Sequence, residues 1–359
     1  MSAKDTAGDP GAALLAASCP VPAGEGETIL LAHGGGGRMT QRLIENVFLK
    51  SFDNPALREL HDGAVFEVGG ARLAFSTDSF VISPLFFPGG DIGSLAVHGT
   101  VNDVAMSGAR PLYLSAGFII EEGFPLADLE RIARSMGEAA RAAEVAVVTG
   151  DTKVVERGKA DGLFINTAGI GVVPPGIEIS GDRARAGDAI LISGTMGDHG
   201  VAIMAHRAGL EFETTIVSDS AALNGLVADM VASVPTIRVL RDPTRGGLAA
   251  TLNEICHQSA VGMRLDEAAI PVRPEVLGAC ELLGLDPLNV ANEGKLIAIA
   301  PAEDAGRLLG VLRRHPLGRD AMVIGEVTVD PARFVRMATR IGGERMIDWL
   351  AGEQLPRIC

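Results

Sequence analysis

Apolar residues recur along the chain with two spacings, and these predict a succession of strands and helices. Short apolar runs, or alternation of apolar and polar residues, predict strands at 64–68, 71–75, 111–121, 145–149, 162–171, 187–194, 236–240, 296–300, 322–329 and 334–337. Apolar residues three or four positions apart predict helices at 39–50, 93–108, 125–143, 248–259 and 302–313. This mixture predicts an α/β (α+β) fold, with helices packed on mixed sheets.

The pattern is interrupted at Val173-Pro-Pro-Gly176, which predicts a domain boundary. We therefore predict two mixed α/β domains, at 28–173 and 174–347. Residues 1–27 are predicted to be a mobile N-terminal extension, and residues 348–359 a flexible tail. Fully extended, such a tail would reach roughly 40 Å.

The composition excludes several classes of function. Of the 359 residues, 47% are hydrophobic, which is enough for a large core, and the net charge of −14 argues against binding to nucleic acid or to anionic lipid. No apolar run approaches the ~20 residues that a membrane span needs. The apolar run before Cys19 is too short, and its flank too acidic, for a signal peptide.

The four cysteines indicate neither a zinc site nor a disulfide framework. Cys19, Cys256, Cys280 and Cys359 lie far apart and show no CxxC spacing. A reducing cytoplasm is the simplest location for such a chain. We expect Cys256 and Cys280 to be ordinary core residues.

A run of four glycines precedes the first predicted helix. Gly34, Gly35, Gly36 and Gly37 would let backbone N–H groups converge on an anion, since no Cβ atoms block its approach. A glycine-rich loop before a helix is a plausible phosphate cradle, but a mobile linker explains the run equally well. No Gly-Lys-Ser/Thr follows, so this is not a Walker loop.

Acidic residues follow predicted strands or interrupt a small-residue helix in the first half. Asp78 and Asp151 are predicted at strand ends, Asp151 lies two residues before Lys153, and Asp103 interrupts an apolar helix. Magnesium bound with a nucleotide typically uses a few carboxylates and phosphate oxygens, so these residues are compatible with ATP and Mg²⁺. Each carboxylate alone could instead be a helix cap or part of a surface ion pair.

Two stretches of the second half add candidate chemistry. Asp242-Pro-Thr-Arg245-Gly-Gly lies between a strand and a helix, where backbone N–H groups and Arg245 would suit a phosphate or an oxyanion. Glu293, beside a glycine at the start of a strand, is a candidate base. Turn capping by Asp242 and a surface charge at Glu293 remain open alternatives.

The chain ends on a cysteine, Cys359. A thiol on the last residue can be acylated and carried between sites if the tail is mobile. An incidental cysteine at a frayed end is the alternative, which the tail alone does not exclude.

Taken together, the motifs resemble the HypE family of hydrogenase maturation factors, within the PurM-like superfamily of aminoimidazole ribonucleotide synthetase and selenophosphate synthetase. The resemblance covers residues 28–359. It rests on the glycine loop, Thr77-Asp-Ser-Phe, Gly99-Thr-Val-Asn-Asp-Val, Thr149-Gly-Asp-Thr-Lys-Val, Asp242-Pro-Thr-Arg-Gly-Gly, Asn292-Glu-Gly-Lys and the terminal Pro-Arg-Ile-Cys.

The resemblance implies an ATP-dependent carbamoyl dehydratase. It implies that a carbamoyltransferase, HypF, loads the thiol of Cys359, and that dehydration yields a thiocyanate whose cyano group passes to iron on a HypC–HypD scaffold. It also implies a homodimer formed through the N-terminal domain. The nickel–iron hydrogenase that would be served is not specified by the sequence.

The resemblance also implies roles for individual residues. The expected catalytic residues are Cys359, Lys153 and Glu293. The expected magnesium ligands are Asp78, Asp103 and Asp151. The expected nucleotide-binding residues are Gly34, Gly35, Gly36, Gly37, Asn102, Asp151, Thr152, Asp242 and Arg245.

Two rival hypotheses remain at this point. A small-molecule synthetase of the same superfamily would resemble a chain with a reactive cysteine inside its glycine-rich loop, whereas Cys19 lies upstream of the loop and precedes a proline. A non-catalytic carrier would use only Cys359 and would not need the acidic residues or Lys153.

Overall fold

The computed structural model describes residues 28–209, 216–350 and 357–359. The predicted extension at 1–27, and residues 351–356 of the predicted tail, lie outside the described residues. Within the described ranges, no helix combines the length and the apolar character that crossing a membrane requires.

Five strands of the described N-terminal half form one sheet, in the order β1-β2-β7-β5-β6. They are β1 Ala64–Val68, β2 Ala71–Phe80, β5 Arg110–Glu121, β6 Ala146–Val155 and β7 Leu163–Val172. All neighbours are antiparallel except β5 and β6. The predicted hairpin is confirmed, with Gly69 and Gly70 at its turn, but β2 extends five residues beyond the predicted end.

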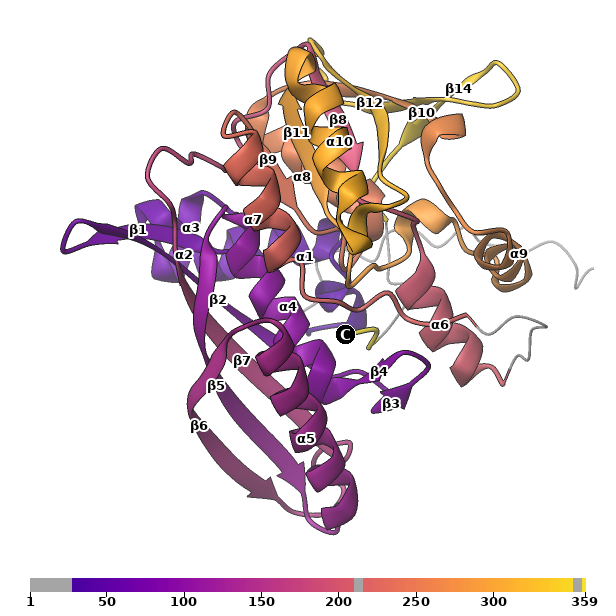
Figure 1. Ribbon diagram of the computed structural model, residues 1–359. Coiled ribbons are helices and arrows are strands. Elements are labelled where there is room, and N and C mark those ends of the chain that lie inside the picture. The colour runs from indigo at the N-terminus through magenta and orange to yellow at the C-terminus, as the bar shows by residue number, and fades with distance from the viewer. Residues whose placement is uncertain (1–27, 210–215, 351–356) are drawn as a thin grey trace, which may run out of the picture.

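One face of this sheet is covered by α4 (Ile92–Met106) and α5 (Leu126–Ala142) (Figure 1). Asp91 caps α4, because its Oδ1 accepts hydrogen bonds from the N–H groups of Gly93 and Ser94. Small residues let α4 lie close to the sheet: a Cβ atom on Gly99 would come within 2.9 Å of the Phe80 ring. The helix that carries Asn102 and Asp103 is therefore fixed firmly.

The opposite face of the sheet carries exposed apolar side chains. They include Phe75, Tyr113 and Ile119. An apolar face of this extent is typical of a surface that another protein chain covers.

The structure corrects the prediction for 145–149, which we expected to be a buried strand ending before Asp151. β6 is an exposed edge strand that continues to Val155, so Asp151 and Lys153 lie in its middle. An apolar run predicts a strand that something covers, but it cannot distinguish burial within the chain from burial against a second chain.

A second sheet has the strand order β14-β13-β10-β12-β8-β11-β9 in the described C-terminal half. Its strands are β8 Asp188–Ile192, β9 Val239–Arg241, β10 Gly262–Asp266, β11 Ile297–Pro301, β12 Met322–Thr328, β13 Val335–Ala338 and β14 Glu344–Ile347. Its helices include α6 Asp198–Arg207, α7 Asn224–Ser233, α8 Gly247–Ser259, α9 Pro274–Leu283 and α10 Ala305–Arg314.

Helices pack on both faces of this second sheet. Leu191 of β8 belongs to one core with residues of α7 and α10, whereas Ile190 and Ile192 belong to another core with residues of α8. This is why β8 reads as a continuous apolar run rather than an alternating one. α7, β10 and α9 were not predicted.

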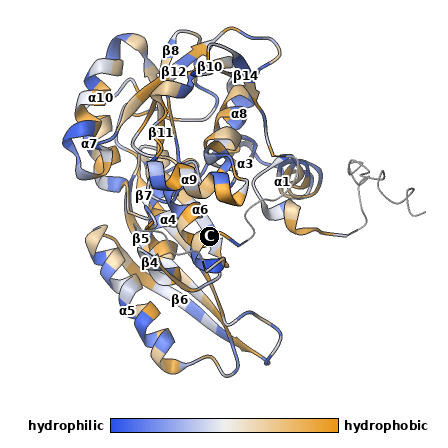
Figure 2. Cartoon of the chain, turned by 90° about the vertical axis from the view of Figure 1, so that its right-hand side faces the viewer, coloured by the Kyte–Doolittle hydropathy of each residue, from blue (hydrophilic) through white to orange (hydrophobic). Residues whose placement is uncertain are grey.

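The two sheets form two lobes, and the C-terminus lies between them (Figures 1 and 2). The end of α4 joins the lobes, because Val104 and Met106 belong to the same core as residues of α7 and α10. Cys256 and Cys280 are buried core residues, as predicted, and burial raises their pKa values to about 12 and about 11.

Candidate functional site

A cavity of about 450 Å³ lies between the two lobes. Its lining comes from both halves of the chain and includes Gly36, Gly37, Asp62, Asp78, Asp103, Asp242, Arg245, Glu293, Trp349 and Cys359. A volume of this size is usual for a small-molecule site. Residues predicted from separate motifs thus meet at one place.

Each of four acidic side chains reaches the cavity from the end of an element or the turn beside one. Asp78 lies near the end of β2, and Asp103 lies in the last turn of α4. Asp242 directly follows β9, and Glu293 lies in the turn before β11. Since β2 packs against α4, and β9 pairs with β11, two pairs of acids are brought to one cavity.

Burial holds these acids in an unfavourable setting. It raises the pKa of Asp103, and the nearby Asp242 raises that pKa further, although a 2.8 Å hydrogen bond from Ser76 Oγ opposes the shift. Burial likewise raises the pKa values of Asp242 and Glu293. Glu293 Oε1 accepts no hydrogen bond from the described residues. The unliganded cavity therefore favours protonated carboxyl groups.

Two arginines lie beside the acids, and their surroundings differ. Arg241 is matched by Asp62 and Glu254, each with an oxygen 2.7 Å from a guanidinium nitrogen. Arg245 makes longer contacts: Nη1 donates to the Gly34 carbonyl oxygen at 3.5 Å, and Nη2 lies 4.0 Å from Asp78 Oδ1. Arg245 is therefore the better placed of the two to bind an anion in the cavity.

The glycine loop at 34–37 closes one side of the cavity. Gly36 has a φ of +75°, and a Cβ atom there would come within 2.6 Å of the Arg245 carbonyl oxygen. A Cβ atom on Gly37 would come within 2.7 Å of the Leu350 carbonyl oxygen. Only glycine permits the loop to lie this close to both segments.

Cys359 is 6% exposed and lines both this cavity and a second one of about 170 Å³. Gly34 and Gly35 line the second cavity. Burial raises the pKa of the Cys359 thiol, while Arg245 opposes that shift and Glu293 adds to it. The thiol is thus protonated and placed close to both a cation and a carboxyl group.

The last three residues are docked rather than free. Val81 N donates a 3.0 Å hydrogen bond to the Cys359 carbonyl, and Arg357 Nε donates one of 2.9 Å to the Val81 carbonyl. Arg357 also forms an ion pair with Asp161. Ile358 is 3% exposed and packs into the core of the N-terminal half. That the tail undocks to be loaded stays a prediction.

Asn102 lies behind the cavity wall and not in its lining. Its Nδ2 donates to the carbonyls of Ala221 at 3.0 Å and Glu293 at 3.3 Å, and its Oδ1 accepts from Leu223 N at 2.7 Å. Its contacts therefore fix the backbone of Glu293. We expected Asn102 to bind the nucleotide, but the residue does not line the cavity, so no contact supports this role.

Asp151, Thr152 and Lys153 lie away from the cavity. They are exposed on β6, where Lys153 forms an ion pair with Asp151, and Asp151 and Thr152 line a separate shallow depression. The expected magnesium ligands are therefore divided within one protomer: Asp78 and Asp103 share the cavity, and Asp151 does not. No cluster of three or more acidic, histidine or cysteine residues in the described chain could hold a metal ion.

Several residues of the lining were missed from the sequence. They are His61, Asp62, Glu254, His257, Gln258 and Trp349. They come from a loop before β1, from the side of α8 and from the segment after β14, and none belongs to a glycine-rich or strand-end motif. No signal in a single sequence distinguishes them from surface residues.

Two family models match the chain. The N-terminal domain of AIR synthase related proteins matches residues 60–173, and the C-terminal domain of the same family matches residues 185–337.

Full-length relatives match as well. A carbamoyl dehydratase HypE of Cupriavidus necator is 66% identical over 330 residues, which cover 92% of this chain and 94% of that protein. A solved HypE in complex with ATP is 56% identical, with a TM-score of 0.79, over 92% of this chain and 100% of that one. The HypE–HypF complex contains a chain that is 49% identical, with a TM-score of 0.82, over 86% and 99%.

We predict that Asp103→Asn stabilises the unliganded protein at neutral and alkaline pH. The folded-state pKa of Asp103 is raised, so the stability linked to its proton is present below the unfolded pKa and is lost as pH rises through the folded pKa. The amide stays neutral and can still accept from Ser76. We expect a gain on the order of 1 kcal/mol at pH 8 that shrinks towards pH 4, measured by urea unfolding. A loss of stability at pH 8 would contradict the account.

Proposed function

Because this chain belongs to the HypE family of carbamoyl dehydratases, we propose that Cys359 carries the carbamoyl group and that the cavity beside it binds ATP. The protein is an ATP-dependent carbamoyl dehydratase of hydrogenase maturation. The observation that carries the residue assignment is the burial of the chain end: the Cys359 thiol lines a cavity together with Arg245 and Glu293.

The reaction needs the amide oxygen to leave as phosphate. In our proposal, the carbamoyl oxygen on Cys359 attacks the γ-phosphoryl group of ATP, a C–O–P linkage forms, and ADP departs. Loss of both N–H protons and breakage of the C–O bond then give a nitrile on sulfur, together with inorganic phosphate. Arg245 offsets the charge on the transferred phosphoryl group. Exclusion of water by the docked tail protects the activated group from hydrolysis.

Glu293 is the proposed base for the amide protons. Its free Oε1 enters the cavity that Cys359 lines, so it can accept a proton from the carbamoyl nitrogen. Burial raises its pKa, which makes the carboxylate a stronger base than an exposed glutamate.

The carboxyl groups fit magnesium bound with ATP. Asp78 and Asp103 share a cavity in which burial and the neighbouring carboxyl groups, Asp242 and Asp78 among them, raise the pKa of Asp103, and a divalent cation would relieve both effects. Mg²⁺ typically takes one or two carboxylates and completes its shell with phosphate oxygens and water. It would supply charge neutralisation on the phosphates. Asp242, in the same lining, is proposed to help hold the nucleotide phosphates through this metal.

The glycine loop is proposed to cover the phosphates. Gly36 and Gly37 line the larger cavity, and Gly34 and Gly35 line the smaller one next to Cys359. The absence of side chains at these four positions lets phosphate oxygens approach the backbone closely, although the N–H group of Gly36 would have to exchange its 3.0 Å hydrogen bond to Thr40 Oγ1 for one to phosphate.

The assignments of Asp151, Thr152 and Lys153 require a second protomer. These residues lie on the edge strand β6, beside exposed Val148 and Val154, and the sheet face with Phe75 and Tyr113 is also exposed. We propose that this face forms the homodimer interface and that Lys153 and Asp151 of one protomer complete the ATP site of its partner. A position in trans reconciles their predicted roles with their distance from Cys359.

The partners and location follow from the same chemistry. We propose that HypF loads Cys359, as the HypE–HypF complex of a relative supports, and that a HypC–HypD complex accepts the cyano group for the iron of nickel–iron hydrogenase. A site that uses ATP and a free thiol suits the cytoplasm.

We predict that Glu293→Gln slows dehydration by about 10²–10⁴-fold, because the amide side chain cannot accept the protons of the carbamoyl nitrogen. The protein is carbamoylated by HypF and incubated with ATP and Mg²⁺, and the mass of its C-terminal peptide is followed. Wild-type protein should lose roughly one water mass, and only when ATP is present.

Either of two results would contradict this assignment. Glu293→Gln turning over at the wild-type rate would place the base elsewhere. Wild-type protein that keeps its mass with ATP would favour the carrier hypothesis over the dehydratase. The synthetase hypothesis predicts a phosphorylated small molecule instead of a changed peptide.

Mixing two inactive variants, Lys153→Ala and Cys359→Ala, tests whether two protomers share the ATP site. A mixed dimer has one complete site if Lys153 acts in trans, because Cys359 of one protomer faces Lys153 of the other. Random exchange should then restore about a quarter of the wild-type sites. A mixture that stays inactive, although mass spectrometry of the intact assembly shows mixed dimers, would place Lys153 in cis or outside the site.

A further inference from the structure

The last three residues bind through their main-chain carbonyls. The carbonyl of Arg357 accepts from Ser83 N at 3.4 Å, and a main-chain oxygen of Cys359 accepts from Val81 N at 3.0 Å. Contacts at alternate residues are those of a pair of strands, in which the intervening carbonyl points away from the neighbouring strand. The carbonyl of Ile358 therefore needs a different donor.

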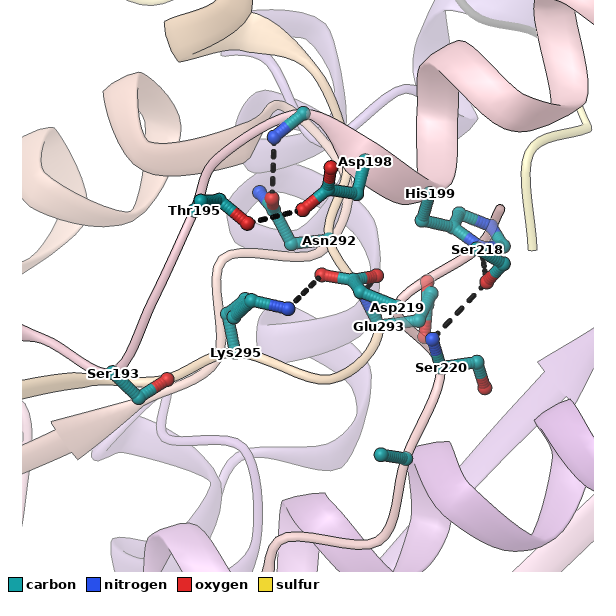
Figure 3. Close-up of polar contacts among 12 residues, drawn as sticks. Ser193, Thr195, Asp198, His199, Ser218, Asp219, Ser220, Asn292, Glu293 and Lys295 are labelled. Carbon is teal, nitrogen blue, oxygen red and sulfur yellow. Dashed lines mark hydrogen bonds and ion pairs between the residues drawn. The ribbon is translucent and has the colours of Figure 1, made fainter. Parts of the chain in front are cut away.

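That donor is the buried ring of His199, at the start of α6. Nε2 lies 2.8 Å from the Ile358 carbonyl oxygen, and Nδ1 lies 2.7 Å from Ser218 Oγ. A carbonyl can only accept, so Nε2 carries the proton and Nδ1 accepts from the Ser218 hydroxyl. Ser218 Oγ in turn accepts from Ser220 N at 3.1 Å. Each donor in this row is thus oriented by the next (Figure 3).

The same three-residue segment also holds the proposed base. Asp219 Oδ1 accepts from Glu293 N at 3.0 Å, and Oδ2 accepts from Lys295 Nζ at 3.0 Å (Figure 3). Gly294, between these two residues, lies so close that a Cβ atom would come within 1.8 Å of the Asp219 carbonyl oxygen. The docked tail and Glu293 are therefore fixed to one support, the segment 218–220.

We propose that His199 is a positioning residue of the dehydration. Held by Ser218, it fixes the Ile358 carbonyl and so directs the carbamoyl group on Cys359 towards Glu293. Neither His199 nor Ser218 lines the two cavities that Cys359 lines, so both act through the tail and not on ATP. This role rests on the proposed function of Cys359 and Glu293, whereas the docking contact itself does not.

Two substitutions separate the hydrogen bond from the packing of the ring. His199→Phe keeps an aromatic ring at right angles to Phe87, whose centroid lies 5.7 Å away, but it removes both hydrogen bonds. His199→Gln keeps an N–H donor for the Ile358 carbonyl. The readout is the rate at which iodoacetamide modifies Cys359 in the full-length protein, quantified on the C-terminal peptide, with buried Cys256 and Cys280 as internal controls.

We expect His199→Phe to raise the rate of Cys359 modification about tenfold and His199→Gln to stay within about threefold of wild type. With HypF-carbamoylated protein, His199→Phe should slow single-turnover dehydration at saturating ATP while the Kd for ATP is unchanged. If His199→Phe does not fold, Ser218→Ala, which removes the partner of Nδ1 together with the acceptor for Ser220 N, should also raise the modification rate.

Modification at the wild-type rate in the folded His199 and Ser218 variants would overturn the positioning role. An equal rise in the modification rate in His199→Gln and His199→Phe would also overturn it, because that result would indicate that the packing of the ring matters and not its hydrogen bond. The modification rate needs no turnover, so failure of the proposed reaction in wild-type protein would appear separately, as an unchanged peptide mass.

Discussion

Buried carboxyl groups crowded into one cavity are the constraint on which the rest of this structure depends. Asp242 and Glu293 are buried and Asp103 is half-buried, and desolvation together with repulsion among neighbouring carboxyl groups raises the pKa values of all three. Such a cluster costs stability in the free protein. It persists because two large cores and the α4 helix that joins them hold its members in place. Magnesium and ATP would turn this cost into affinity, since they supply the charges that the cavity lacks.

Cys359 lines the same cavity as these carboxyl groups. If Cys359 is loaded by one protein and unloaded on another, as we propose, its thiol must leave the cavity, so its docking has to be specific without being permanent. The dock combines backbone hydrogen bonds from Val81 and Ser83, side-chain hydrogen bonds from His199 and Arg207, the pairing of Arg357 with Asp161 and the burial of Ile358 in the core. These contacts are made by the main chain and by the side chains of Arg357 and Ile358, whereas the Cys359 thiol lines the cavity. The dock can therefore accept both a free and a loaded cysteine.

Much of this could be predicted from the sequence, because the chemistry lies where elements begin or end. Asp78, Asp242 and Glu293 stand beside apolar strands, and their motifs meet in one cavity once the strands pair. The strand β6 was predicted, but its burial and its end were wrong, because an apolar run does not reveal whether the rest of the chain covers it. His199, Ser218 and Trp349 were missed, because their roles arise from contacts between residues far apart in sequence. The resemblance implied that Asn102 binds the nucleotide, whereas its side chain forms hydrogen bonds with the backbone of Ala221, Leu223 and Glu293.

The central claim is that the free cavity keeps protonated carboxyl groups that ionise when the nucleotide and its metal bind. Titration calorimetry with Mg²⁺ and ATP, in buffers of different ionisation enthalpy, counts the protons exchanged on binding. The account predicts net release of protons at neutral pH, because metal and phosphate binding favour the deprotonated carboxylates, and it predicts a smaller release for Asp103→Asn. Binding without any release of protons by the wild-type protein would contradict it.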